Sequence, residues 1–289
     1  MRRLSRPLII CVLLLTACSP AAPSPTPIPL SGARKGAAPA ATPSPSASPS
    51  PAPTQLLTVP LGHPAVVDSP LYAAPRVKAS CDIPAITSGS RPSMNKYMAA
   101  VSTCLDRIWA GSFKEARIYF TPPKRKFVQR RVRDPACGMM PAKGADGTYC
   151  GATTTYYVLV PKYSLRPWAA TWISEVIAHE YGHHVQYWTN MLAYEEAAAD
   201  VADKRSAADL LSRRLELQAE CFAGVAVSAM RRQMPPWQEY RDLYWGTLDG
   251  AWIRDHGRLS TQLKWLEKGY RSGRPGACDT WSVPKREVT

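Results

Sequence analysis

Two short segments of the chain carry residue types whose spacing suits metal chemistry. The string HEYGH at residues 179–183 places His179 and His183 four residues apart. Residues with this spacing share one face of a helix, so both imidazoles can bind the same ion, and neutral imidazole is a good zinc ligand. Glu180 adjoins the first histidine and can accept a proton from a water on that ion. The motif therefore predicts a metal-dependent hydrolytic site.

A third protein ligand must come from elsewhere, because catalytic zinc sites usually combine three protein ligands with one water. Glu216 and Glu220 are also four residues apart, and Glu216 lies 33 residues after His183. We expect Glu216 to bind the metal and Glu220 to hold a ligand histidine, since such a carboxylate fixes the orientation of the imidazole. The competing interpretation is a pair of solvated glutamates beside Arg213 and Arg214.

Two helices must position these segments. Apolar residues on most sides of the histidine motif predict a largely buried helix over 167–189. A second helix is expected over 207–231, with Ser206 as its N-cap and Pro235-Pro236 beyond its end. Histidines and a glutamate on a buried helix are costly unless something compensates them, and a metal ion is the simplest compensation.

The remaining pattern predicts an α+β domain that is mainly helical with a small sheet. Apolar residues recurring at three and four positions predict an amphipathic helix over 92–110. The run TTTYYVLV predicts a strand over 153–160, and an exposed edge on that strand could pair with an extended peptide. Further helices are expected over 237–253 and 260–271.

The first part of the chain has the composition of an export signal and a tether. Three arginines precede a short apolar run, and small residues lead to Cys18, which is the layout of a secretory signal. Twelve of the 28 prolines lie between Ser19 and Pro60, and such a segment stays extended and mobile. We therefore expect a signal peptide over 1–17, a disordered linker rich in Pro, Ala and Ser over 18–75, and the folded domain over 76–289.

The residues around Cys18 indicate where the protein resides. Leu15-Thr16-Ala17-Cys18 resembles the bacterial lipobox, which implies a lipid on Cys18; an ordinary signal peptide cleaved nearby is the other interpretation. We expect a lipoprotein anchored to the membrane on the extracytoplasmic side of the cell envelope. The formal net charge of +14 favours anionic envelope polymers as neighbours. Nucleic acid is not expected as a partner of an exported chain.

Six cysteines are left when the signal peptide and Cys18 are set aside. An even number in an oxidising compartment suggests three disulfides, although six cysteines allow 15 connectivities. We favour Cys137–Cys150, because glycines make the intervening loop easy to close, and then Cys81–Cys104 and Cys221–Cys278 as the order-preserving remainder. A cysteine metal site is the rival interpretation, but the chain has no CxxC pair.

The two metal-ligand segments also carry a family resemblance. The strings AHEYGHHVQ at 178–186 and ELQAECFAG at 216–224 resemble the paired motifs of the putative neutral zinc metallopeptidase family. His256-Gly257 and the residues after it resemble the C-terminal pattern of that family, so the likeness covers roughly 81–277. The family usually has aspartate where this chain has Glu220.

This resemblance implies a zincin-like domain that binds one zinc ion. By the family pattern His179, His183 and Glu216 are the metal ligands and Glu180 is the catalytic base. The expected function is zinc-dependent hydrolysis of peptide bonds in envelope or extracellular proteins, through a metal-activated water and a glutamate general base. A non-catalytic, zinc-stabilised envelope binding protein is the alternative.

The residue that stabilises the developing oxyanion is not evident from the motifs. His256 is one candidate for this donor. A structural histidine in a turn with Gly257 is the other interpretation of the same residue.

Overall fold

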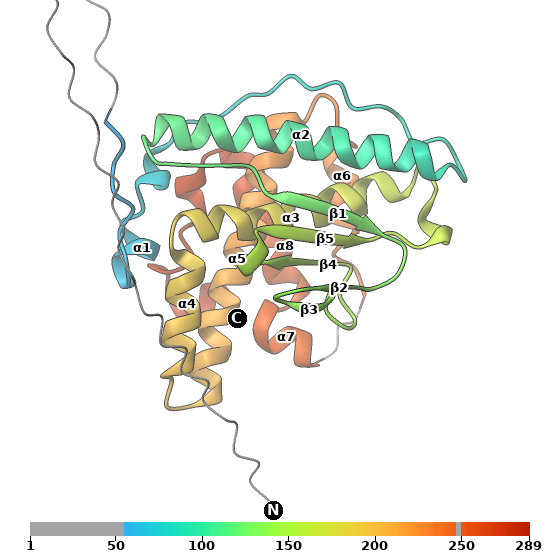
Figure 1. The fold of residues 1–289 in the computed structure, drawn as a ribbon. Coiled ribbons are helices and arrows are strands. Elements are labelled where there is room, and N and C mark those ends of the chain that lie inside the picture. The colour runs from blue at the N-terminus through green and yellow to red at the C-terminus, as the bar shows by residue number, and fades with distance from the viewer. Residues whose placement is uncertain (1–54, 247–249) are drawn as a thin grey trace, which may run out of the picture. The chain divides into compact units, whose positions relative to one another are not determined.

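The computed structural model describes residues 55–246 and 250–289 (Figure 1). The expected signal peptide, Cys18 and the linker up to residue 54 lie outside the described residues. None of the described helices has both the length and the apolar character that crossing a membrane requires. In chain order the helices and strands are α1 (His63–Val67), α2 (Arg91–Glu115), β1 (Lys124–Val128), β2 (Val132–Asp134), β3 (Gly138–Met140), β4 (Gly147–Cys150), β5 (Thr155–Leu159), α3 (Ala169–Trp188), α4 (Met191–Asp200), α5 (Arg205–Met230), α6 (Trp237–Asp242), α7 (Gly250–His256) and α8 (Leu259–Ser272).

A three-stranded sheet in the order β1-β5-β4 lies beside α3 (Figure 1). The central strand β5 runs parallel to β1 and antiparallel to β4, and its Tyr156 and Val158 are fully buried. The predicted strand therefore exists, and the mainly helical α+β architecture is confirmed. The proposed exposed edge on this strand is wrong, because β1 and β4 pair with its two sides; β4 is an edge strand instead.

Helices α3 and α5 cross closely at the level of the histidine motif. A Cβ at Gly182 of α3 would lie 2.9 Å from the carbonyl oxygen of Ala219 in α5. Only glycine permits this approach of two backbones. Because Ala219 lies between Glu216 and Glu220, the crossing brings that glutamate pair against the face of α3 that carries the histidines.

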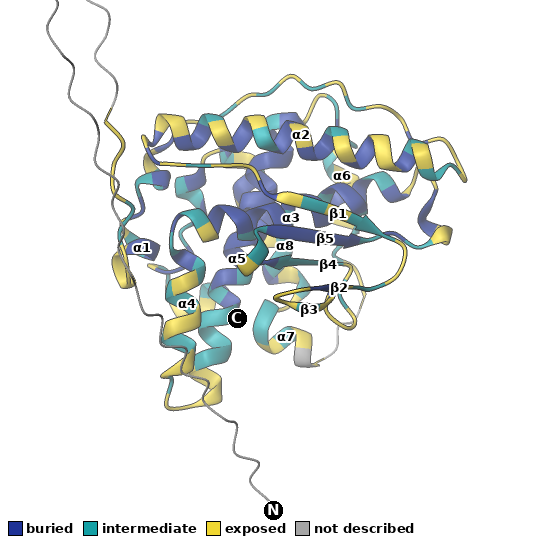
Figure 2. Ribbon diagram, in the orientation of Figure 1, coloured by how far each residue is buried: buried dark blue, intermediate teal, exposed yellow. Residues whose placement is uncertain are grey.

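The hydrophobic core lies where α2, α3, α5 and α8 meet, and α3 and β5 are largely buried (Figure 2). Trp109 of α2 contacts Phe222 of α5 edge to face, with ring centroids 5.4 Å apart. Gly224 of α5 and Gly269 of α8 lie so close to the opposite helix that neither position has room for a Cβ. Large side chains and close glycine contacts therefore fix α5 in the centre of the domain.

Three disulfides connect distant parts of the domain, in the pairing favoured from the sequence. Cys81–Cys104 links an irregular segment to α2, and Cys137–Cys150 links the turn between β2 and β3 to β4. Cys221–Cys278 joins α5 to the C-terminal segment. The last of these adjoins Glu220 in sequence, so it also restrains the part of α5 that faces the histidines.

Residues 63–73 differ from the extended linker expected over 18–75. They form α1 and a short 3-10 helix, Pro70–Ala73, in which Val66 and Leu71 are fully buried. The hydroxyl of Tyr72 donates to the Val66 carbonyl over 2.8 Å and accepts from the Gln218 side chain over 2.7 Å. The folded domain therefore begins before residue 76, because apolar side chains in this segment reach the core.

Two helix predictions also need correction. The helix expected over 237–253 is divided into α6 and α7, because Gly246 has a φ of 116°, which a helix cannot include. Helix α5 begins at Arg205 with Lys204 as its N-cap and no side-chain cap hydrogen bond, so Ser206 does not cap it.

Candidate metal centre

His179, His183 and Glu216 converge where α3 crosses α5. The Oε2 atom of Glu216 lies 3.2 Å from His179 Nε2 and 3.3 Å from His183 Nε2. One possible ligand atom from each residue lies within 4.8 Å of the other two. Their side chains are between 12% and 16% exposed, so the cluster is mostly shielded from water but still accessible.

This set of side chains fits a zinc ion. Two imidazole nitrogens and one carboxylate oxygen are typical zinc ligands, and three protein ligands leave a position for water. Nearby, the Oε2 atom of Glu180 is buried and has no hydrogen-bond partner among the described residues. A buried acceptor without a partner is costly, and a water held at the metal position would offer it a hydrogen.

Hydrogen bonds from Nδ1 orient both histidines. His179 Nδ1 bonds Glu220 Oε2 over 3.0 Å, and His183 Nδ1 bonds Gln186 Oε1 over 2.9 Å. Because both partners are acceptor oxygens, each Nδ1 donates to its partner, which directs each Nε2 toward Glu216, the side from which a metal would be bound. The structure thus places Glu220 at one ligand histidine, and the longer glutamate side chain spans the gap.

Gln186 has a role that the sequence analysis did not assign. Its amide nitrogen donates to the Leu215 carbonyl over 2.7 Å and to Gln218 Oε1 over 3.0 Å. The side chain therefore ties a ligand histidine on α3 to the backbone of α5, one residue before Glu216. Its position three residues after His183 was the available signal, because that spacing shares a helix face.

Tyr244 and Glu175 complete the surroundings of Glu220. The hydroxyl of Tyr244 donates to Glu220 Oε1, while Oε2 bonds the histidine. Burial raises the pKa of Glu175 to about 8, and the neighbouring charge of Glu220 adds to the rise. Both effects favour the protonated, uncharged form of the Glu175 carboxyl. No sequence pattern marked Tyr244, because it follows α6 and lies 24 positions after Glu220.

The carboxylate of Glu180 lies against the first residue of β4. A Cβ at Gly147, the first residue of that strand, would lie 2.6 Å from Glu180 Oε1 and 2.7 Å from Val176 Cγ1. Burial raises the pKa of Glu180, although the neighbouring histidines oppose the rise. A raised pKa suits a carboxylate that must accept and then release a proton near neutral pH.

The pKa values of Glu216 and Glu180 are shifted in opposite directions, which suits the two carboxylates to different roles. Burial alone would raise the pKa of Glu216, but His256 and His183 hold it well below its ordinary value. Glu216 is therefore ionised, as a metal ligand must be, whereas Glu180 has the raised pKa of a proton acceptor. His256 belongs to this environment as well, since its Nε2 lies 3.5 Å from Glu216 Oε2.

A second group of possible ligands, Asp134 with Cys137 and Cys150, is structural. Its two sulfurs form a disulfide, and Asp134 accepts hydrogen bonds from two backbone amides and from the Tyr157 hydroxyl. The bond from Tyr157 is the main cause that holds the pKa of Asp134 well below its ordinary value. The buried carboxylate thus has its partners without a metal.

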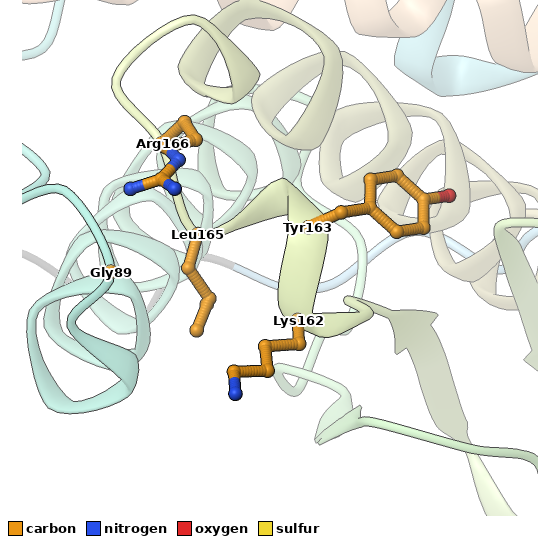
Figure 3. Close-up of a pocket in the computed structure, with 5 residues that line it drawn as sticks. All are labelled: Gly89, Lys162, Tyr163, Leu165 and Arg166. Carbon is orange, nitrogen blue, oxygen red and sulfur yellow. The ribbon is translucent and has the colours of Figure 1, made fainter.

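A cavity of about 460 Å³ lies in another part of the fold (Figure 3). It is lined by residues before α2 and between β5 and α3: Gly89, Lys162, Tyr163, Leu165 and Arg166. None of the predicted site residues lines it, so this cavity does not define the metal centre.

Comparison with known proteins agrees with the geometry. Residues 73–243 match the family described as "Putative neutral zinc metallopeptidase". "Uncharacterized protein Rv2575" of Mycobacterium tuberculosis is 28% identical over 221 residues, which cover 64% of this chain and 70% of the relative. "Uncharacterized protein YpfJ" of Escherichia coli is 27% identical over 211 residues, which cover 64% of this chain and 71% of the relative. No solved structure matches the chain.

The matched segment contains the helices that form the centre. It includes α3 and α5, with both histidines, both glutamates and Gln186, and it ends before α7. It also spans more than half of the 289 residues. The chain therefore belongs to the putative neutral zinc metallopeptidase family.

Proposed function

We propose that this domain is a zincin-like metallopeptidase that hydrolyses peptide bonds in proteins or peptides of the cell envelope. One observation carries the proposal. A single carboxylate oxygen of Glu216 lies within 3.3 Å of the Nε2 atoms of both motif histidines. The buried carboxylate of Glu180, on the helix that carries these histidines, has no hydrogen-bond partner for Oε2 in the described part of the chain.

The residues of the site divide the work of hydrolysis. When bound by His179, His183 and Glu216, a zinc ion supplies a Lewis acid and lowers the pKa of a water to about 7. Glu180 takes a proton from the attacking water as its oxygen bonds to the peptide carbon. It then gives that proton to the leaving nitrogen as the carbon–nitrogen bond breaks.

The edge strand β4 offers a place for the substrate. An extended peptide can add to an exposed sheet edge through main-chain hydrogen bonds, and β4 is an edge of the three-stranded sheet. Gly147 at the start of this strand lies directly against Glu180. A peptide paired with β4 would therefore pass beside the proton acceptor.

Two features of the chain support the proposed location in the envelope. Three disulfides are typical of proteins that fold in an oxidising compartment. The lipobox-like sequence before Cys18 supports a lipid anchor that holds the enzyme on the extracytoplasmic face of the membrane. Peptides and proteins at that surface are then the available substrates.

Peptide cleavage by the purified mature protein tests this proposal. The wild type should bind one zinc ion and cleave members of a peptide library. Glu180→Gln should keep the zinc and lose roughly 10²–10⁴-fold in kcat, the contribution of a general base. Glu196→Gln, at an exposed glutamate of α4, is the matched control and should cleave normally. Zinc binding without any cleavage by the wild type would instead support a binding protein.

A further inference from the structure

We infer that a cavity between the first half of α5, the end of α7 and the C-terminal segment binds an anion that carries a phosphoryl group. The cavity has a volume of about 260 Å³. None of its lining residues is a proposed zinc ligand or the proposed base Glu180. The inference goes beyond the proposed hydrolysis and does not depend on it.

The side chains that line this cavity carry an excess of positive charge. Four lining residues are cationic and come from different parts of the chain: Arg213 of α5, Arg254 of α7, Arg258 at the N-cap of α8, and Lys285 near the C-terminus. Asp209 of α5 is the acidic residue of the lining. Four positive charges and one negative charge leave a net charge of +3, and a concave surface of one sign attracts ligands of the opposite sign.

Arg213 is the buried cation of this lining, with 9% of its surface exposed. Its guanidinium donates to the main-chain carbonyls of Val288, over 3.2 Å, and of Arg254. Carbonyl oxygens accept its hydrogens but do not neutralise its charge. A buried charge without an ionic partner is costly, so a bound anion would stabilise this side chain.

The nearest acidic side chains provide only part of that compensation. Asp209 Oδ1 lies 3.7 Å from Arg205 Nε, and Asp255 Oδ1 lies 2.9 Å from His256 Nδ1. Burial lowers the pKa of Arg213, and Asp209 and Asp255 oppose this shift without cancelling it. The positive charge of Arg213 is therefore incompletely balanced within the domain.

The other three cations of the cavity are open to an arriving ligand. Arg254, Arg258 and Lys285 are exposed, and none of the ion pairs between described residues includes their side chains. The main-chain oxygen of Thr289, which also lines the cavity, accepts from the Thr261 hydroxyl over 2.7 Å. One buried guanidinium and three exposed cations can thus contact a ligand from several sides.

The types of donor favour a phosphoryl group over a single carboxylate. Three of the four cations are arginines, whose planar guanidinium can bond two phosphoryl oxygens at once. The hydroxyl of Ser206 adds a neutral donor to the lining. A volume of about 260 Å³ is below the roughly 300–1,000 Å³ of sites for drug-sized ligands, so a small phosphate ester suits the cavity.

Isothermal titration calorimetry of the mature protein with inorganic phosphate, in a chloride buffer, tests the inference. The titration is repeated after zinc has been removed, so that phosphate on a metal ion is not counted. The double variant Arg254→Gln/Arg258→Gln removes two exposed charges of the cavity. The double variant Arg130→Gln/Arg133→Gln, at exposed arginines outside it, changes the net charge equally and is the matched control.

The wild type should bind phosphate saturably, at one site per chain, with and without zinc. Arg254→Gln/Arg258→Gln should bind it roughly 10–100-fold more weakly, because two charge-assisted hydrogen bonds are lost. The control pair should bind like the wild type. Arg213→Gln should also lose affinity; if this buried substitution unfolds the protein by circular dichroism, the exposed pair still decides the question.

A second ligand identifies the source of the phosphoryl group. Glycerophosphoglycerol carries the same group as a phosphodiester, as lipid headgroups do. Tighter binding of this diester would support a headgroup, and tighter binding of inorganic phosphate would support a free phosphate or its monoester. In both cases Arg254→Gln/Arg258→Gln should weaken the binding.

Other outcomes overturn the inference. The cavity is not the site if wild type and Arg254→Gln/Arg258→Gln bind phosphate equally, or if the wild type shows no saturable binding. An equal loss in Arg130→Gln/Arg133→Gln would assign the effect to overall charge. Acetate that displaces phosphate at equal concentration would contradict selection of a phosphoryl group. Because no peptide is cleaved in these titrations, their failure leaves the proposed function untouched.

Discussion

Gly147 in β4 lies against the carboxylate of Glu180 so closely that a Cβ at this position would fall 2.6 Å from Oε1. A sheet edge and the predicted catalytic base are thus in direct contact, although 33 positions separate them in the chain. The conformation of the base depends on the absence of one side chain.

Gly147→Ala should displace Glu180 and reduce kcat/KM by about 10²-fold, because a shift of about 1 Å at a reacting group has an effect of that size. Zinc affinity should change little, since Gly147 contacts none of the three proposed ligands. Gly111→Ala in α2, where nothing lies within 4 Å of a new Cβ, is the control and should keep full activity. Normal peptide cleavage by Gly147→Ala would disprove this dependence.

Glu216→Ala should remove most of the zinc affinity, because it deletes a carboxylate that lies within 3.3 Å of both motif histidines. Metal analysis after dialysis against a weak chelator measures the bound zinc, with the wild type treated in parallel. Circular dichroism checks that the helices persist. Equal zinc content and affinity in the two proteins would contradict the assignment of Glu216 as a ligand.

Glu220→Gln should weaken zinc binding by roughly 10–100-fold, because the charged acceptor for His179 Nδ1 is lost. Glu220→Asp tests the length of the side chain, since the family usually has aspartate here; it should bind zinc more tightly than Glu220→Gln. Competition with a fluorescent chelator gives both affinities. Wild-type affinity in Glu220→Gln would show that Glu220 does not support the ligand.

Gly182→Ala should destabilise the domain by about 1–3 kcal/mol, the usual effect of forcing extra atoms into a packed interface. The new Cβ would lie 2.9 Å from the Ala219 carbonyl oxygen, which is backbone and cannot rotate away. Urea unfolding measures the change in free energy. Zinc affinity should fall as well, because the substitution pushes α3 from α5. An unchanged unfolding midpoint would show that the two helices can separate freely.

Replacing both Cys221 and Cys278 by alanine should lower the free energy of unfolding by about 2–4 kcal/mol, because the bond restricts the unfolded chain. The variant lacking Cys137 and Cys150, which are 13 positions apart rather than 57, is the comparison. The shorter loop should give the smaller loss under the chain-entropy model. Urea unfolding of both variants under oxidising conditions measures the two losses in free energy of unfolding. Equal losses would contradict the prediction.

Long periodic segments were predictable because their patterns are local. Local apolar patterns predicted α3, α5 and α8 within about two residues at each end, and the string TTTYYVLV predicted β5. The helix expected over 92–110 exists as α2 but continues to Glu115. The short strands β3 and β4 were not predicted, since sequences such as GTYC become strands only beside a partner. Helix α4 was also not predicted. The start of the folded domain was placed too late in the chain, because α1 follows directly on a proline-rich segment.

The residues of the metal centre also fall into two groups: those that a local pattern predicts, and those that only the tertiary structure brings together. Local spacing alone placed His179, Glu180 and His183 on one helix, because a helical turn brings residues four apart together whatever surrounds it. Tertiary structure decided the rest: the crossing of α3 and α5 at Gly182 brings Glu216 to the histidines, β4 rather than β5 forms the sheet edge, and α7 brings His256 beside them. Contacts between segments far apart in the chain depend on packing, which no local pattern of residues encodes.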